Sequence, residues 1–241
     1  MAKKLPIVAL ISGRGSNLKA IIDADDPLVE IRAVISNRPQ AGGLIYAQQA
    51  DIPTEVLDHT QFKSRLDFDM ALQIRIDSYQ PKLVVLAGFM RILSPEFVAH
   101  YQGRLLNIHP ALLPAFRGLD THRRALEAGV KEHGASVHFV TADLDAGPVI
   151  IQARVPVLVD DDEESLAARV LREEHRIYPQ AIHWFAEERL QLQGEQVLLD
   201  GQALTFKHQK HQIRGWLCLR GKLPGVIKHL SPLSKNESKY F

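Results

Sequence analysis

The hydrophobic positions of the chain form short apolar runs that alternate with segments of helical spacing. Continuous apolar runs are typical of strands buried on both faces of a parallel sheet, and helical spacing predicts the crossovers between them. We therefore predict an α/β fold with a doubly wound, mostly parallel sheet. The predicted strands are 7–12, 31–36, 54–57, 83–87, 105–108, 135–140 and 149–155; the helices are 16–24, 43–50, 64–79, one from 94, and 163–187; a small hairpin covers 190–204.

Helix signals sharpen several of these boundaries. Ser64 and Asp162 are placed to cap the helices that follow them. Ser94 also precedes a proline and a glutamate, a favourable start for a helix. Pro179 lies inside the last helical pattern and should kink or break that helix near Tyr178.

Length and composition describe an ordinary globular chain. Its 241 residues suffice for one large α/β domain, and 46% hydrophobic and 24% charged residues are typical values. The apolar runs are far shorter than the roughly 20 residues of a membrane-spanning helix. Cys218 is the only cysteine, so no intrachain disulfide and no cysteine metal cluster can form. We expect a cytoplasmic protein, either a monomer or a homodimer.

The charge is unevenly distributed. Residues 207–241 hold eight of the 29 basic residues and one of the 28 acidic residues. This segment is therefore net +7, and residues 1–206 are net −6. A basic terminus can contact nucleic acid or acidic surfaces, but it is more commonly a solvated tail. We predict a domain over residues 1–206 with a C-terminal extension over 207–241, and do not expect nucleic acid as a partner.

An amide and an imidazole lie two residues apart at the end of one predicted strand, at Asn107 and His109. Residues i and i+2 of an extended chain face the same side, so both can address one substrate atom. A hydrogen-bond donor beside a proton carrier suits acyl transfer. Many Asn-x-His triplets are only structural, so spacing alone leaves the role open.

A glycine-containing turn follows the first strand, in the sequence Ser-Gly-Arg-Gly-Ser-Asn-Leu of residues 12–18. Backbone amides at a helix N-terminus favour a phosphate group. Leu18 stands where a dinucleotide fingerprint needs its third glycine, and no Gly-Lys-Ser/Thr follows. The turn predicts a simple phosphate ester; the alternative is a tight turn that binds nothing.

Further candidates lie at other strand ends. Residues 88–93 could line a site for a flat aromatic ligand or could belong to the core. His138 lies within a strand, where a histidine is usually structural. Asp145 becomes important if it reaches His109, since a carboxylate would orient that ring. No histidine follows a metal-binding spacing, so we predict no metal site.

Four motifs occur together in one order: residues 12–18, 87–93, 107–114 and 136–148. With these motifs the sequence resembles the folate-dependent phosphoribosylglycinamide formyltransferases of purine synthesis, over about residues 5–204. The resemblance implies a Rossmann-like formyltransferase fold, glycinamide ribonucleotide as the substrate and 10-formyltetrahydrofolate as the co-substrate. Arg14 departs from the familiar pattern, which commonly has an uncharged residue there, and the segment beyond about residue 206 has no recognised counterpart.

The resemblance also implies site residues. The catalytic group would be Asn107, His109 and Asp145, supported by His138. Substrate phosphate would be held by Gly15, Ser16 and Asn17, and Glu174 would contact the same substrate. The folate site would be lined by Arg65, Met90, Arg91, Ile92, Leu93, Asn107, Thr141, Ala142, Asp143, Leu144 and Asp145.

The sequence leaves three alternatives to this function open. Another folate formyltransferase, or a formyltetrahydrofolate hydrolase, can share the Asn-x-His-Pro core. A hydrolase of this type would carry an N-terminal regulatory domain, and a methionyl-tRNA formyltransferase would carry a larger C-terminal domain. A non-catalytic module that binds a sugar phosphate would explain the turn without any turnover of folate.

Overall fold

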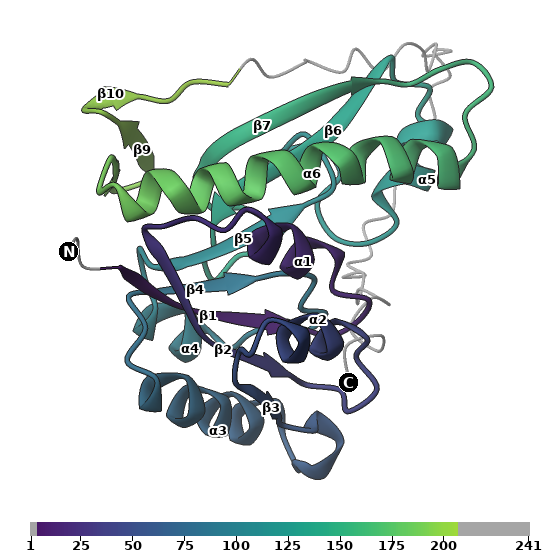
Figure 1. Cartoon of the computed structure of the whole chain (residues 1–241). Coiled ribbons are helices and arrows are strands. Elements are labelled where there is room, and N and C mark those ends of the chain that lie inside the picture. The colour runs from purple at the N-terminus through teal and green to yellow at the C-terminus, as the bar shows by residue number, and fades with distance from the viewer. Residues whose placement is uncertain (1–3, 207–241) are drawn as a thin grey trace, which may run out of the picture. The chain divides into compact units, whose positions relative to one another are not determined.

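A seven-stranded sheet organises the chain in the computed structural model, which describes residues 4–206. The strand order is β3-β2-β1-β4-β5-β6-β7 (Figure 1). Pairing is parallel from β3 to β5 and antiparallel at β5–β6 and β6–β7, which confirms the predicted mostly parallel sheet. The strands are β1 Leu5–Ile11, β2 Val29–Ser36, β3 Thr54–Val56, β4 Leu83–Leu86, β5 Leu105–His109, β6 Glu132–Phe139 and β7 Val149–Pro156. The predictions for residues 207–241 and for Cys218 lie outside the described residues.

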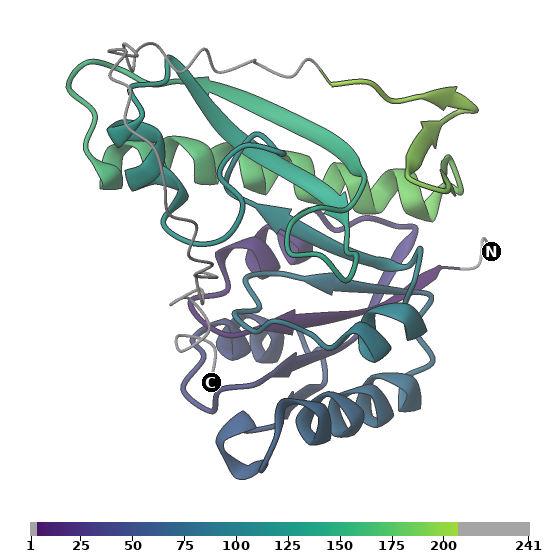
Figure 2. The same cartoon turned by 180° about the vertical axis from the view of Figure 1, so that it is seen from behind.

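Helices cover both faces of the sheet, and strand β1 shows why. Alternate side chains of a strand point to opposite faces, so Ile7 and Ile11 join one apolar core while Val8 and Leu10 join another. Helices α1, α2 and α6 close the first core, and α3 and α4 close the second (Figures 1 and 2). The helices are α1 Ser16–Asp23, α2 Gly43–Gln49, α3 Arg65–Ser78, α4 Pro95–His100, α5 Thr121–Glu127 and α6 Glu163–Ala186.

Three helices begin at the caps that the sequence predicts. The Ser64 hydroxyl accepts a hydrogen bond from the Asp67 amide at 3.1 Å. The Ser94 hydroxyl likewise accepts from the first turn of α4. Asp162 and Ser165 bond reciprocally at 2.8 and 3.1 Å, which forms a capping box at the start of α6.

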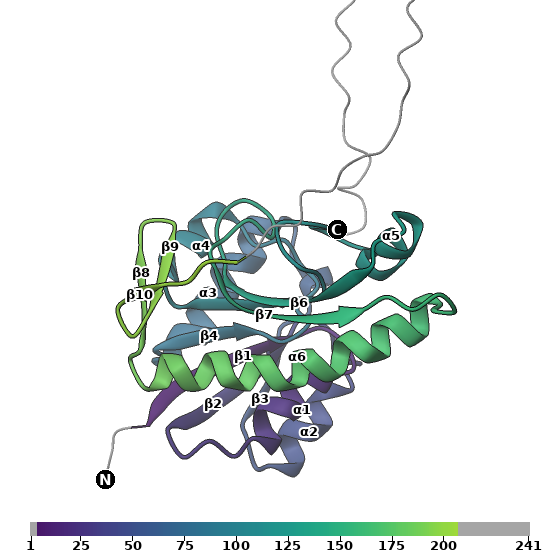
Figure 3. The same cartoon turned by 90° about the horizontal axis from the view of Figure 1, so that it is seen from above.

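Helix α6 continues through Pro179 as a single element, so the break that the sequence offered beside a kink does not occur (Figure 3). Proline removes one backbone donor, but tertiary packing holds the helix together. The fully buried Tyr178 hydroxyl lies 3.0 Å from the carbonyl oxygen of Leu86 and 3.2 Å from that of Leu106. This shared hydrogen bond ties α6 to β4 and β5 beside the proline.

The C-terminal part of the described chain forms the predicted hairpin, with a short third strand added. Strands β8 Leu190–Gln193, β9 Gln196–Leu199 and β10 Gln202–Ala203 pair antiparallel. The apolar pattern does not predict α5, because only Thr121 and Ala125 of its seven residues are buried. Among the described helices, none combines the length and apolar composition needed to cross a membrane.

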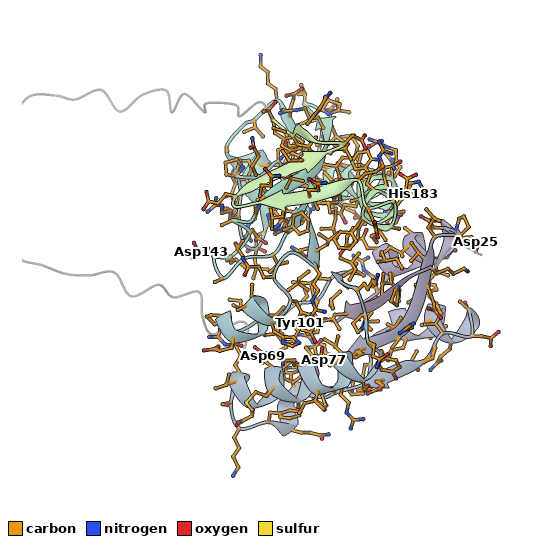
Figure 4. All side chains as sticks on the ribbon, turned by 90° about the vertical axis from the view of Figure 1, so that its left-hand side faces the viewer. Asp25, Asp69, Asp77, Tyr101, Asp143 and His183 are labelled. Carbon is orange, nitrogen blue, oxygen red and sulfur yellow. The ribbon has the colours of Figure 1, made fainter. Side chains whose placement is uncertain are left out.

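Polar contacts between helices and loops reinforce the two layers. The Tyr101 hydroxyl donates to Asp77 Oδ1 at 2.8 Å and ties α4 to α3 (Figure 4). Burial and the Asp77 carboxylate raise the pKa of Tyr101, so the phenol keeps its proton. On the opposite layer, His183 Nδ1 of α6 lies 2.7 Å from Asp26 Oδ2 in the loop after α1.

The Tyr178 hydrogen bond gives a stability prediction. Tyr178→Phe keeps the buried ring but removes the donor shared by two carbonyl groups, so the free energy of unfolding should fall by about 1 kcal/mol. Urea unfolding followed by circular dichroism measures this. Tyr46→Phe is the control, because within residues 4–206 the Tyr46 hydroxyl makes no hydrogen bond. Equal stability of the two variants would contradict the role given to Tyr178.

His133 gives a prediction of pH dependence. Burial, with the nearby His122 and His109, lowers the pKa of His133 from 6.5 to about 4. The unfolded chain therefore binds this proton first as the pH falls, and stability should be lost between pH 6.5 and 4. One such group contributes up to roughly 3 kcal/mol across that window. In urea titrations at several pH values, His133→Gln should show a shallower loss; an identical slope would refute this.

Candidate active site

The carboxyl ends of β1, β4 and β5 lie side by side, because β4 pairs with both other strands. The strands that follow β1 are added on one side of it, as β2 and β3, and the later strands are added on the other side, from β4 onward. Ligand sites of open α/β sheets form where the strand order reverses in this way. The Ser12 amide donates to the Gly88 carbonyl at 3.1 Å, so the turn after β1 touches the loop after β4. Strand β5 delivers Asn107 and His109 to the same edge.

His109 is buried, and its ring is fixed at both nitrogens. Nε2 donates to the Phe116 carbonyl at 2.9 Å, and Nδ1 faces Asp145 Oδ2 at 3.4 Å. Both ring nitrogens therefore face oxygen atoms, one of a backbone carbonyl and one of a carboxylate. The structure thus brings together the histidine and the aspartate that lie 36 positions apart in the sequence.

Asp145 is held in a demanding conformation. Its φ is +48°, in the left-handed region that non-glycine residues seldom adopt. The same Oδ2 atom accepts the Gly118 amide at 2.9 Å, and the side chain is 9% exposed. Backbone strain of this kind persists where surrounding contacts fix it, and it is common at functional sites.

The amide of Asn107 is oriented by His138. Burial lowers the pKa of His138 to about 4, so its ring is neutral at pH 7. His138 Nδ1 donates to the Phe139 carbonyl at 2.9 Å, which leaves Nε2 to accept from Asn107 Nδ2 at 3.1 Å. The second N–H of the Asn107 amide remains for another acceptor. This contact is a physical basis for the supporting role predicted for His138.

The segment after His109 is shaped by two polar side chains that sequence reasoning missed. The fully buried Ser136 hydroxyl donates to the Ala111 carbonyl at 2.6 Å and accepts the Leu113 amide at 3.1 Å. Gln152 Nε2 donates to the Leu113 carbonyl at 2.9 Å. Ser136 lies opposite His109 in the β5–β6 ladder, a register that the sequence alone does not reveal.

The turn after β1 needs glycine at position 15. Gly15 has φ +75°, and a Cβ atom there would lie 2.3 Å from the Gly43 Cα atom. The Gly43 amide in turn donates to the Gly13 carbonyl at 3.0 Å. Gly15 is the N-cap of α1 and supplies no capping side chain, and the first turn of α1 contains no acidic residue. The helix start is thus compatible with an anionic ligand.

Asn17 and Glu174 meet beside this turn. Asn17 Nδ2 donates to Glu174 Oε2 at 2.7 Å, which joins α1 to α6. Burial raises the pKa of Glu174, an effect that the hydrogen bond from Asn17 partly offsets. Asn17 Oδ1 is also buried and accepts no hydrogen bond from residues 4–206. A ligand hydroxyl or amine would satisfy that oxygen.

Most of the residues predicted for folate lie at the surface or are half-buried, and one lies in the core. Met90 and Leu144 are each 47% exposed, although apolar, in the loops after β4 and β6. The Arg91 guanidinium lies 4.7 Å from the centre of the Phe68 ring, and Arg65 begins α3. Ile92 is half-buried, and Thr141, Ala142 and Asp143 are exposed, with Asp143 labelled in Figure 4. The Leu93 side chain instead joins the core beneath α3 and α4.

Over residues 4–206, no group of three or more histidine, cysteine, aspartate or glutamate side chains is arranged to hold a metal ion.

Known proteins share this sequence and fold. The formyl transferase family matches residues 5–182. A phosphoribosylglycinamide formyltransferase of Escherichia coli (strain K12) is 57% identical over 201 residues, which cover 82% of this chain and 95% of that protein. The Haemophilus influenzae protein of the same name is 46% identical over equal shares. The solved phosphoribosylglycinamide formyltransferase of Coxiella burnetii, in complex with CHES, has a TM-score of 0.81 and 57% identity, covering 84% of this chain and 97% of that one.

These matches extend over nearly the whole described part of the chain, and they agree with the strand order and with the resemblance drawn from the four motifs. The chain belongs to the formyl transferase family, among the phosphoribosylglycinamide formyltransferases.

Proposed function

We propose that this protein transfers the formyl group of 10-formyltetrahydrofolate to the amine of glycinamide ribonucleotide, in purine synthesis. The observation that carries the proposal is the approach of His109 Nδ1 to Asp145 Oδ2, at 3.4 Å, next to the oriented amide of Asn107. Its relatives of 46–57% identity carry the corresponding name.

The catalytic step needs charge stabilisation at one oxygen. As the substrate amine forms its bond to the formyl carbon, negative charge develops on the formyl oxygen. Asn107 donates its second amide N–H to that oxygen, since the first is held by His138. Protonated His109 adds a positive charge beside the same oxygen. Its ring is held there by the Phe116 carbonyl and the Asp145 carboxylate.

Proton transfer completes the reaction. The attacking amine becomes cationic and loses a proton, which Asp145 accepts directly or through water. The formyl carbon–nitrogen bond of the folate then breaks, and the departing nitrogen takes up the proton that Asp145 accepted, directly or through water. Asp145 is suited to this role because Gly118 and His109 hold one of its oxygens in place.

The sugar phosphate is assigned to the turn after β1. Gly15, Ser16 and Asn17 bring the start of α1 to the phosphate, where backbone N–H groups favour an anion. Glu174 contacts the ribose or glycinamide part of the same molecule, next to Asn17.

The folate is assigned to the two loops that expose Met90 and Leu144. A flat ring system would cover these apolar side chains, which water otherwise surrounds. Arg65 and Arg91 supply positive charge for the carboxylates of the folate. The remaining members of this proposed site are the backbone of Ile92 and Leu93 and the loop of Thr141, Ala142, Asp143 and Asp145.

A direct assay separates this function from the alternatives. Glycinamide ribonucleotide and 10-formyltetrahydrofolate are mixed with the protein, and absorbance follows release of tetrahydrofolate. Turnover that requires the ribonucleotide is expected. Turnover without it would instead indicate a hydrolase, and phosphate-ligand binding without turnover would indicate a binding module.

We also propose that the enzyme acts in the cytoplasm, as a monomer or a homodimer. A single cysteine is typical of proteins from a reducing compartment. The substrates are small molecules, and no nucleic acid, membrane or metal partner is part of the proposal.

His109 gives the first kinetic prediction. His109→Ala removes the positive charge beside the developing oxyanion, and kcat should fall by about 10²–10³-fold. Steady-state kinetics with both substrates saturating measures this. The matched control is His100→Ala on α4, where the ring pairs with Asp77; its kcat should remain within about twofold, in line with ordinary surface substitutions. Near-native turnover of His109→Ala would contradict the mechanism.

Asn17 gives the second kinetic prediction. Asn17→Asp places a carboxylate against Glu174 and beside the proposed phosphate. The repulsion between these like charges should raise the KM for glycinamide ribonucleotide about tenfold or more. The KM for 10-formyltetrahydrofolate should change far less. Asp23→Asn, at the other end of α1, is the control. Equal increases in both KM values would remove the phosphate assignment.

A further inference from the structure

The Ser12 hydroxyl joins two segments that belong to different substrates in the proposed function. Ser12 Oγ accepts the Met90 amide at 2.8 Å and donates to Asn37 Oδ1 at 2.5 Å. Ser12 is 3% exposed and Asn37 is 1% exposed, so water does not replace either bond. Met90 begins the proposed folate loop, and Ser12 is the first residue of the turn assigned to the phosphate.

The far end of this hydrogen-bond chain is fixed. The Asn37 carbonyl accepts from His59 Nδ1 at 2.8 Å, and His59 lies in a 3₁₀ helix, His59–Gln61. Asp58 caps that helix through the Thr60 amide at 3.0 Å. Asn37 therefore offers a stationary acceptor, and the direction of the Ser12 hydroxyl is set.

Ser12 also holds the folate loop through its backbone, because its amide donates to the Gly88 carbonyl at 3.1 Å. Two bonds from one residue thus reach two points of the Gly88–Met90 segment. Any displacement of the turn after β1 moves the acceptor of the Met90 amide. Conversely, a loop displaced by its ligand pulls on the residue that begins the turn.

From this geometry we infer that Ser12 is a positioning residue which couples the two substrate sites. A phosphate ligand that orders the turn also orders the Met90 loop, and folate binding then becomes tighter. The effect is reciprocal, because a coupling between two binding equilibria acts equally on both. The inference rests on the proposed function, since it takes its two ligands from there.

Binding without turnover tests the coupling. Tetrahydrofolate carries no formyl group, so it can be titrated by calorimetry with and without saturating glycinamide ribonucleotide. In the wild-type protein the ribonucleotide should tighten tetrahydrofolate binding by about three- to tenfold, the size expected for one buried hydrogen bond. In Ser12→Ala that ratio should approach one, while the ribonucleotide still binds.

Ser36→Ala is the matched control. Ser36 is a fully buried serine at the end of the neighbouring strand β2, and its hydroxyl also bridges backbone groups, donating to the Arg38 carbonyl at 2.8 Å and accepting the Arg38 amide at 3.1 Å. It has no bond to the Met90 loop. Its loss should lower stability without changing the coupling ratio, which separates positioning from a general structural effect.

Ser12→Cys provides a second variant should Ser12→Ala fail to fold. The thiol nearly preserves the size of the side chain but is a weak hydrogen-bond partner, so the ratio should again approach one. A ratio near one in the wild type, or a wild-type ratio in the Ser12 variants, would overturn the coupling. Absence of formyl transfer by the wild type would overturn the proposed function instead, so the two failures are distinguishable.

Discussion

The pairing of Asp145 with His109 is the constraint on which the rest of the site depends. Both side chains are less than one-tenth exposed, and a carboxylate removed from water requires compensation by charge and by hydrogen bonds. The His109 ring faces this carboxylate at 3.4 Å, and the Gly118 amide donates a hydrogen bond to it. The Phe116 carbonyl fixes the remaining ring nitrogen. His109 ends β5, and Phe116 and Gly118 lie in the segment that follows it, so the course of that segment fixes the surroundings of Asp145.

The antiparallel half of the sheet supports this segment. Register pairs Asn107 with His138 and His109 with Ser136, so two residues of β6 lie directly opposite the two predicted catalytic residues of β5. His138 orients the amide, and Ser136 bonds the loop that follows the histidine. One strand pairing thereby positions both groups. A shift of the register by one residue would turn both supporting side chains to the other face of the sheet.

Local sequence patterns predicted the features that depend only on residues close together in the chain. The buried strands, the caps at Ser64 and Asp162 and the turn around Gly15 all follow from short stretches of sequence, and the structure contains each of them. The Asn-x-His spacing indicated a site because the period of a strand places both side chains on one face. By contrast, Ser136 and Gln152 bond to residues that are distant in the sequence. Short sequence patterns do not reveal such contacts, because they depend on which strands pair.

Pro179 shows most clearly how tertiary structure overrides a local rule. Glu174 and Tyr178 are four positions apart and therefore share one face of α6. The Tyr178 hydroxyl bonds to the carbonyl groups of Leu86 and Leu106, and Leu106 immediately precedes Asn107. One helical turn before that anchor, Glu174 meets Asn17 beside the proposed phosphate turn. A break at Pro179 would release the anchor, and Glu174 would lose its fixed position relative to the strand ends that carry the proposed catalytic group. An unbroken helix is thus a requirement of the site as well as of the core.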